Sequence, residues 1–286
     1  MVRLGLHALG IGAGARREVV DAVAIAGEAG EIRTLWIGEH VVMVDRSASR
    51  YPYSPDGEIA VAADADWLDP LIALSFAAAV TDSIRLATGV LLVPEHNPVL
   101  LAKQTASLDV LCGGRFALGV GVGWSREEFI ALGVSFERRG DRADEYLSAM
   151  CALWREDPAS FAGEFVSFSD IHVNPKPLRG GRIPIIVGGN SDRALRRAAW
   201  LGDGWYGFNL DGPDHVRERI ACLRDLCRAA GRDPSEVEIV VALAAPKAGD
   251  RAALDRLGVE ELVIVASPPA EPDEAERWLS DLQRRL

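Results

Sequence analysis

Apolar runs of strand length alternate with amphipathic runs of helix length along the whole chain, and this βαβα order implies a parallel sheet covered by helices. Eight apolar runs are predicted to be strands: Gly5–Leu9, Thr34–Ile37, Leu86–Leu91, Phe116–Val120, Pro184–Val187, Gly204–Gly207, Val237–Ala242 and Leu262–Val265. The predicted helices between them are Arg17–Ala29, Pro70–Val80, Val99–Leu111, Asp141–Arg155, Arg193–Leu201, Pro213–Ala230 and Pro272–Arg285.

The fold class is therefore α/β, and the 286 residues are expected to form a single domain, 1–286. Eight strands suit a closed (β/α)8 TIM barrel. An open doubly wound sheet can also hold eight strands, so the strand count alone does not decide between the two.

Two segments interrupt the alternation. Asp45–Asp66 is polar and too long for an ordinary connection, so it is expected to be either a functional loop over the strand ends, after the second strand, or partly disordered. Phe161–Arg182 begins with FAGEFVSF, which indicates a small hairpin inserted before the fifth strand, and ends in an extended NPKPLRGGRIP approach to that strand.

Composition narrows the classes of partner. A net charge of −11 argues against nucleic acid as the main partner, because phosphate binding needs a clustered positive surface. No apolar run is long enough to span a membrane and no signal peptide is visible, so a cytoplasmic protein is expected. The four cysteines show no metal-ligand spacing, which predicts free thiols and no metal site.

The segment LGLHALGIGAGARREVV contains Gly10, Gly12 and Ala15 in the spacing of a dinucleotide-binding turn, and the acid Glu39 ends the second strand. This pattern is weak, because Glu39 lies 24 positions beyond Ala15 and stands in GEHVV, where a barrel strand would hand over to its active-site loop.

Glycines also follow the fourth strand, in LGVGVGW, and the fifth, in VGGNSDRALRRAA. Three strand ends that open with glycine are spread around the sheet. They suit one ligand lying across a barrel mouth better than a single dinucleotide crevice.

A family resemblance rests on several ordered segments: EAG and LWIGEH within residues 28–40, RLATGVLLVPEHNPVLLAKQTASLD, LDVLCGGRFALGVGVGWSREEFIALGVSFERRGDRADEYLSAMCALW and PKPLRGGRIPIIVGGNSDRALRRAAWLGDGW. The chain resembles the bacterial luciferase-like superfamily, in particular its oxidoreductases that use the deazaflavin coenzyme F420. The resemblance implies a (β/α)8 barrel with the cofactor at the C-terminal ends of the strands. The opening glycines then become a βα loop.

The resemblance places His40 beside the deazaflavin ring, as a catalytic group that exchanges a proton with substrate. Its neighbour Glu39 is expected to be the carboxylate that orients it, or else a plain acid of the barrel rim. Trp124 stands where the sugar-phosphate dehydrogenase branch carries an acidic catalytic residue, which suggests a more apolar pocket or another proton route. Glu127 and Glu128 are candidates for catalysis, or simply first-turn acids of a helix.

The expected cofactor-binding residues lie at three strand ends: Gly89, Val90, Gly121, Gly123, Gly188, Gly189, Asn190 and Ser191. The resemblance implies a β-bulge with a cis peptide between Gly89 and Val90. The Gly188–Ser191 segment precedes a helix and is expected to bind a phosphate, with Arg193 or Arg197 nearby.

The resemblance also offers a partner for the arginines at 138, 139 and 142, which could meet the polyglutamate tail of a deazaflavin. A solvated helix face, or ion pairs with Asp141, Asp144 and Glu145, accounts for these arginines equally well.

Three functions stay open. The first is hydride transfer between F420 and a small organic substrate; the second is an FMN-dependent monooxygenase served by a separate reductase; the third is a non-catalytic flavin-binding barrel. A homodimer is expected, because Pro70–Val80 and Val99–Leu111 would otherwise expose apolar helix faces.

Overall fold

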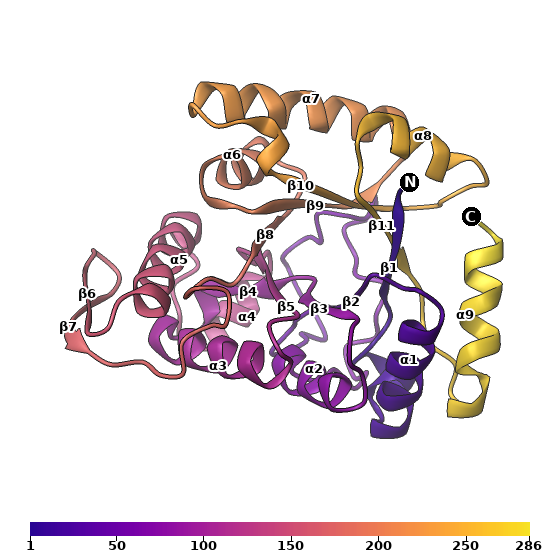
Figure 1. Ribbon diagram of the computed structural model, residues 1–286, viewed down its shortest axis with the longest axis horizontal. Coiled ribbons are helices and arrows are strands. Elements are labelled where there is room, and N and C mark those ends of the chain that lie inside the picture. Colours follow the sequence, from indigo (N-terminus) through magenta and orange to yellow (C-terminus); the bar gives the residue numbers. More distant parts are fainter.

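The computed structural model describes residues 1–286 and forms a closed ring of parallel strands surrounded by helices (Figure 1). Strands pair in the order β3-β2-β1-β11-β10-β9-β8-β5, and β3 also pairs with β5, which closes the ring and confirms the predicted (β/α)8 barrel. The strands are β1 Arg3–His7, β2 Thr34–Ile37, β3 Arg85–Thr88, β4 Leu91–Leu92, β5 Phe116–Gly121, β8 Ile185–Gly188, β9 Gly204–Leu210, β10 Glu238–Leu243 and β11 Glu261–Val265.

The helices form an outer layer around this ring (Figure 1). They are α1 Arg17–Ala29, α2 Pro70–Ala79, α3 Pro98–Leu111, α4 Arg126–Ala131, α5 Arg139–Arg155, α6 Asp192–Leu201, α7 Pro213–Ala229, α8 Asp250–Leu257 and α9 Ala275–Arg284. The sequence patterns did not predict α8, which has only eight residues, half of them charged. None of the helices combines the length and the apolar character needed to cross a membrane.

Side chains alternate between the outside and the inside of the barrel along each strand. On β1, Leu4 and Leu6 belong to the large apolar core between strands and helices. A Cβ atom on Gly5 would instead meet Trp36 and Glu261 in the barrel interior. His7, two residues further on, therefore also faces the interior, at the end where the strands finish.

The C-terminal ends of the strands form one rim, called here the barrel mouth, and several helices begin next to it. The side chains of Asn97, Ser125 and Ser191 cap α3, α4 and α6 by accepting hydrogen bonds from first-turn N–H groups. Gly12–Ala15 forms one 3-10 turn before α1, so the opening glycines belong to a βα loop, as the family resemblance implied.

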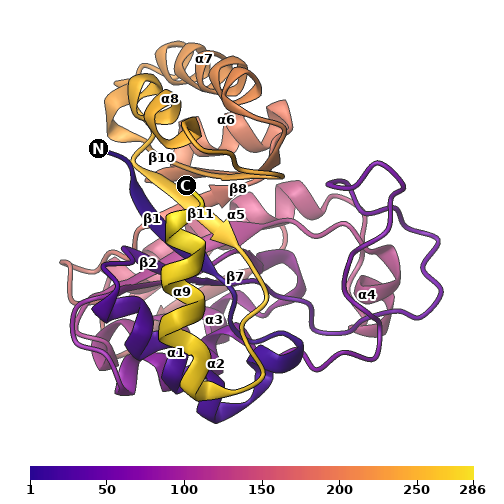
Figure 2. The same cartoon turned by 90° about the vertical axis from the view of Figure 1, so that its right-hand side faces the viewer.

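Both predicted interruptions are present. Residues 45–66 form an irregular loop that projects on the same side of the barrel as α4 (Figure 2). The expected hairpin is β6 Ala159–Ala162 with β7 Ser167–Ile171, paired antiparallel ahead of β8. All four cysteines are free thiols.

The third barrel strand is broken between β3 and β4, where the Gly89–Val90 peptide bond is cis. This confirms the predicted cis bond at that position. Beside the break, the Thr88 hydroxyl donates a hydrogen bond of 2.7 Å to the Gly119 carbonyl oxygen. A Cβ atom on Gly119 would lie 1.8 Å from the Thr88 carbonyl oxygen, so β5 can pass the break only with glycine there.

We expect Gly119→Ala to lower the free energy of unfolding by about 3 kcal/mol or more, because its methyl group overlaps a backbone oxygen that no rotamer change can move. Gly140→Ala is the matched control, since its Cβ would meet only the end of the Arg197 side chain, 3.3 Å away. That control should change the free energy of unfolding by less than about 1 kcal/mol. Urea denaturation measures both. Equal stability of the two variants would contradict the steric argument.

Candidate active site

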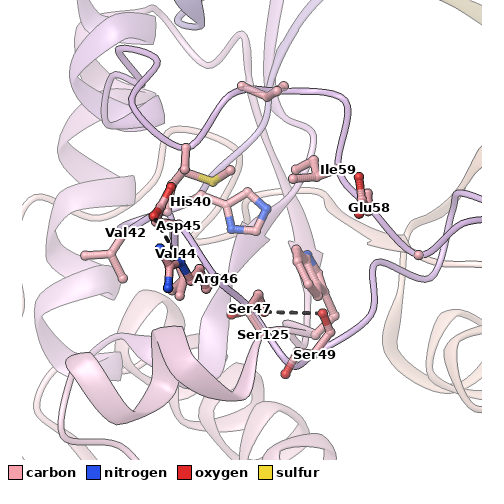
Figure 3. A pocket seen from close by; sticks show the side chains of 15 residues that line it. His40, Val42, Val44, Asp45, Arg46, Ser47, Ser49, Glu58, Ile59 and Ser125 are labelled. Carbon is pink, nitrogen blue, oxygen red and sulfur yellow. Dashed lines mark hydrogen bonds and ion pairs between the residues drawn. The ribbon is translucent and has the colours of Figure 1, made fainter.

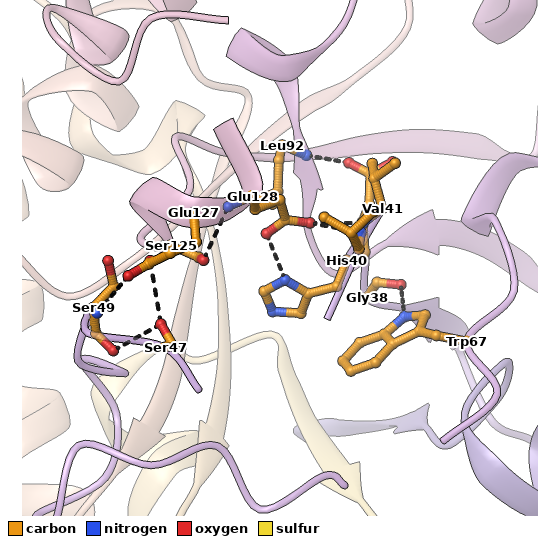
Figure 4. Close-up of polar contacts among 12 residues, drawn as sticks. Gly38, His40, Val41, Ser47, Ser49, Trp67, Leu92, Ser125, Glu127 and Glu128 are labelled. Carbon is orange, nitrogen blue, oxygen red and sulfur yellow. Dashed lines mark hydrogen bonds and ion pairs between the residues drawn. The ribbon is translucent and has the colours of Figure 1, made fainter. Parts of the chain in front are cut away.

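His40 lies just beyond the end of β2, and its imidazole is held by Glu128 (Figure 4). The Nδ1 atom of His40 is 2.8 Å from Oε2 of Glu128, whose residue is fully buried. The other carboxylate oxygen accepts hydrogen bonds from the backbone N–H groups of Val41, at 2.7 Å, and Val42, at 3.2 Å. Because a carboxylate only accepts hydrogen bonds, Nδ1 carries the hydrogen and Nε2 is left to face the site.

The sequence indicates Glu128 only as a candidate for catalysis or a first-turn acid, whereas in the structure its carboxylate holds His40. Ser125 and Glu128 have the spacing of a capping box, in which the glutamate usually bonds back to the cap residue. Ser125 does accept a bond from the Glu128 N–H, at 3.3 Å, but the Glu128 carboxylate reaches across to residues 40–42 instead. The spacing predicted the helix start, and nothing in it indicated the distant partner.

The expectation that Glu39 orients His40 is wrong. The Glu39 carboxylate accepts a 2.6 Å bond from the Leu92 N–H and contacts Nε2 of His96 at 3.0 Å. Burial acts against the charge of His96, but the hydrogen bond and the charge of Glu39 outweigh it and raise the pKa of His96. Glu39 therefore fixes the chain beyond the β3–β4 break.

Glu95 is a third carboxyl group in this region, and neither of its oxygens has a hydrogen-bond partner. Burial, followed by the charges of Glu128 and Glu39, raises the pKa of Glu95 to about 9. The side chain is thus a neutral carboxylic acid at pH 7. A Cβ atom on Gly123 would come within 3.1 Å of its Oε1, which places Glu95 against the end of β5.

Aromatic rings surround His40. The edges of Trp67 and Trp124 meet its imidazole at centroid distances of 5.0 and 5.7 Å. Trp67 is fixed by a 3.1 Å bond from its Nε1 to the Gly38 carbonyl oxygen, whereas the buried Nε1 of Trp124 has no partner. Tyr51, from the 45–66 loop, packs against Trp124 at 5.3 Å. The loop is therefore folded onto the site.

A cavity of about 330 Å³ lies between this loop and the start of α4, with His40 and Trp124 in its wall (Figure 3). Its apolar lining includes Val42, Ile59 and Val61. Asp45, Arg46 and Glu58 also line the cavity, so its lining is mixed, and it is not the more apolar pocket that Trp124 suggested. Glu127 holds the loop over the cavity, since its carboxylate accepts bonds from the Ala48 and Ser49 N–H groups.

The floor of the barrel mouth is formed by inward-facing residues near the C-terminal ends of the strands: His7, Val90, Gly121, Gly188 and Phe208. The two methyl groups of Val90 lie between β5 and β8. A Cβ atom on either Gly121 or Gly188 would stand 2.6 Å from one of those methyl groups. The two glycines therefore make room for the Val90 side chain between β5 and β8.

The sequence profile of the family described as luciferase-like monooxygenase matches residues 7–285. The chain belongs to this luciferase-like monooxygenase family. An uncharacterized protein of Mycobacterium tuberculosis is 36% identical over 267 residues, which cover 93% of each chain.

Two solved structures show the luciferase-like fold again. An F420-dependent secondary alcohol dehydrogenase, in complex with an F420–acetone adduct, is 17% identical with a TM-score of 0.77, and the match covers 98% of each chain. The oxygenating constituent of 3,6-diketocamphane monooxygenase from Pseudomonas putida, in complex with FMN, is 18% identical with a TM-score of 0.64. That match covers 85% of this chain and 66% of the other.

In this luciferase-like barrel, the Gly188–Ser191 segment joins β8 to α6 as predicted, but part of it is already bonded within the protein. The Gly189 N–H donates to the Tyr206 carbonyl oxygen at 3.2 Å. The Asn190 side chain exchanges two bonds with the backbone of Phe208. Ser191 caps α6 through the Ala194 N–H. The free donors of the segment therefore lie at the first turn of α6.

The arginines expected near this segment, Arg193 and Arg197, and those of the separate cluster at 138, 139 and 142 have different partners. Arg197 is bound to Asp144, and Arg138 to Asp141 and Glu164, so these are engaged in ion pairs. Arg139 donates to the Gly123 carbonyl oxygen at 3.0 Å. Burial and then the positive charges of Arg126 and Arg193 lower the pKa of Arg139, so Arg193 lies near it.

The third arginine of the predicted cluster, Arg142, donates through its guanidinium to the Ser135 carbonyl oxygen. Arg142 therefore holds the turn before α5. Of the two arginines proposed to bind a phosphate, Arg193 is the one that is exposed and has no ion pair.

The protonated state of Glu95 predicts how the stability of the folded chain depends on pH. Between pH 4.5 and about 9 the folded chain holds a proton on Glu95 that the unfolded chain releases, so raising the pH through this window destabilises the folded state. Glu95→Gln removes the effect. At pH 4.5 it should match the wild type, and at pH 7 it should be more stable by about 2 to 3 kcal/mol.

Urea unfolding at the two pH values measures this difference. Glu218→Gln, on the exposed face of α7, is the control and should track the wild type at both. A Glu95→Gln variant that also tracks the wild type would show that Glu95 ionises normally.

Proposed function

We propose that this luciferase-like protein is an oxidoreductase that transfers a hydride between coenzyme F420 and a small organic substrate, with His40 exchanging the accompanying proton. The observation that carries the proposal is the bond between His40 Nδ1 and the fully buried Glu128. It fixes the tautomer and direction of an imidazole that lines a cavity at the barrel mouth.

His40, Glu128 and the loop each have a distinct task in this proposal. Glu128 holds the hydrogen of Nδ1 and so fixes the tautomer, which leaves Nε2 to exchange a proton at the substrate oxygen. The loop and the two tryptophan rings exclude water from the reacting groups. The deazaflavin, when bound, supplies the carbon that gives or takes the hydride.

The expected cofactor residues fit such a group in two places. The floor around Val90, with Gly89, Gly121 and Gly188, would hold the flat ring. The start of α6, after Gly189, Asn190 and Ser191, would bind a phosphate through free N–H groups, with Arg193 at hand. Gly123 would act indirectly, since its carbonyl oxygen orients Arg139.

The fold likeness to the F420-dependent neighbour supports F420. The match covers 98% of the F420-dependent alcohol dehydrogenase but only 66% of the FMN-containing diketocamphane monooxygenase. A positioned acid–base residue also serves hydride transfer to a carbonyl directly. The alternative is an FMN-dependent monooxygenase with a separate reductase, which the likeness to the diketocamphane enzyme supports.

Titration of the purified protein with F420 and with FMN, followed by fluorescence, tests the cofactor. We expect F420 to bind and to be reduced or oxidised when candidate alcohols, carbonyls and enones are added. Tight binding of FMN without binding of F420 would favour the monooxygenase. Cofactor binding with no turnover of any substrate would favour a non-catalytic barrel.

His40→Ala is expected to lower the turnover number roughly 10²- to 10⁴-fold, because a positioned acid or base contributes that much to catalysis. The dissociation constant for F420 should stay unchanged. His172→Ala is the control, because this exposed histidine pairs with Asp157 beyond the β7 hairpin. Steady-state kinetics distinguish the two variants. Wild-type turnover in His40→Ala would assign His40 to structure alone.

We also propose that the protein is a homodimer that pairs through α2 and α3. These neighbouring helices expose apolar side chains: Ile72 is 62% exposed and Phe76 43% on α2, and Leu100 is 57% exposed on α3. A contiguous apolar surface of this kind is typical of an interface.

Sedimentation at micromolar concentration should give twice the chain mass of 30.8 kDa. Ile72→Glu combined with Leu100→Glu should give the monomer, because two charges would be buried in the interface. Ile130→Glu, an equally exposed position on α4, should leave the dimer intact. A monomeric wild type would overturn the proposal.

A further inference from the structure

His7 is the ionisable residue of the mouth floor, and no step above uses it. It is the last residue of β1 and is 9% exposed. Burial lowers the pKa of His7 to about 4, so the imidazole is neutral at pH 7. A neutral imidazole carries its hydrogen on one nitrogen and accepts a bond at the other, so the pattern of its partners decides what it offers to a ligand.

Tyr206 determines which nitrogen of His7 carries the hydrogen. The ring of Tyr206 packs at a tilt against Trp36, with the centroids 4.8 Å apart, and its hydroxyl lies 3.4 Å from Nδ1 of His7, its hydrogen-bond partner in the protein. Tyr206 is 1% exposed, and burial raises its pKa well above the usual value, so the hydroxyl keeps its hydrogen. That hydrogen points to Nδ1, because a buried hydroxyl hydrogen without an acceptor is costly. The His7 hydrogen therefore lies on Nε2.

Nothing in the protein accepts a bond from Nε2, and two glycines leave its surroundings open. A Cβ atom on Gly38 would stand 3.2 Å from Nε2 of His7, and a Cβ atom on Gly89 would stand 3.4 Å from Cε1. Any other residue at Gly38 would thus cover the nitrogen. Because both neighbouring positions are glycine, the Nε2–H group of His7 is a free hydrogen-bond donor on a floor that is otherwise apolar.

We propose that His7 contacts the cofactor directly, with Nε2–H donating a hydrogen bond to a carbonyl oxygen or ring nitrogen on the polar edge of a flavin or deazaflavin laid on the floor. The inference rests on the proposed function only in taking the ligand to be such a ring, and both cofactors carry this edge. His7 would then orient the ring on Val90 with its polar edge toward β1.

The test compares dissociation constants and absorption spectra of bound F420 and bound FMN. His7→Leu keeps the volume and removes the donor, and should weaken binding of the ring about 5- to 10-fold, as loss of one neutral hydrogen bond does. It should also shift the absorption maximum of the bound ring. His7→Gln supplies an N–H donor from its amide and should restore most of the affinity and the spectrum.

Two further measurements separate this role from support of the fold. Gly38→Ala leaves His7 in place and covers Nε2, so it should weaken binding as well. Nitrogen-15 NMR of the ligand-free protein should report a neutral His7 with its hydrogen on Nε2, and Tyr206→Phe should release that preference.

The outcomes are distinguishable. Unchanged affinity and spectrum in His7→Leu overturn the inference alone, provided the wild type binds either cofactor. If His7→Leu fails to fold, Gly38→Ala decides in its place, and wild-type affinity there overturns the inference. A wild type that binds neither F420 nor FMN overturns the proposed function and this inference together.

Discussion

The geometry of the barrel mouth depends on one buried carboxylate. Glu128 has no exposed surface, and both of its oxygens are bonded to residues 40–42, which follow β2. A buried charge is tolerated only when it is paired and hydrogen-bonded, so these partners cannot drift away. The pairing joins the start of α4 to the end of β2, across a gap of more than eighty residues in the sequence. The imidazole, the long loop and the cavity wall all take their positions from it.

Patterning in the sequence was sufficient for the α/β class and the eight strands, because each strand is a short apolar run, but the family resemblance was needed to choose the closed barrel over an open sheet. The two glycine series and the broken third strand were also found, with help from the family resemblance. Contacts between side chains of distant elements could not be predicted from the sequence. Glu39 precedes His40 in the chain, yet consecutive residues at a strand end point in opposite directions, and Glu39 turns to Leu92 and His96. The short α8 was missed because it has only eight residues and half of them are charged.

Acidic and basic side chains lie on different sides of the barrel mouth. Three carboxyl groups, those of Glu39, Glu95 and Glu128, gather behind His40, and Glu95 stays protonated because it is buried and because the charges of the other two lie near. Arg139 and Arg193 lie on another side, near the start of α6, where burial and then the charges of Arg126 and Arg193 lower the pKa of Arg139. An elongated anionic ligand would be drawn with its charge toward the arginines and its neutral end toward the imidazole. Orientation would thus be favoured before any close contact forms.

The ring is closed by two strands from opposite ends of the chain. β1 pairs with β11 over five residues, from Arg3 opposite Glu261 to His7 opposite Val265. During synthesis β1 emerges first and must wait for almost the whole chain before this neighbour exists, because domains complete their long-range pairing only when both segments are available. Until then one edge of β1 is unpaired and prone to wrong pairing. The mouth floor at His7 is consequently among the last parts of the molecule to be assembled, and an interrupted chain would lack it.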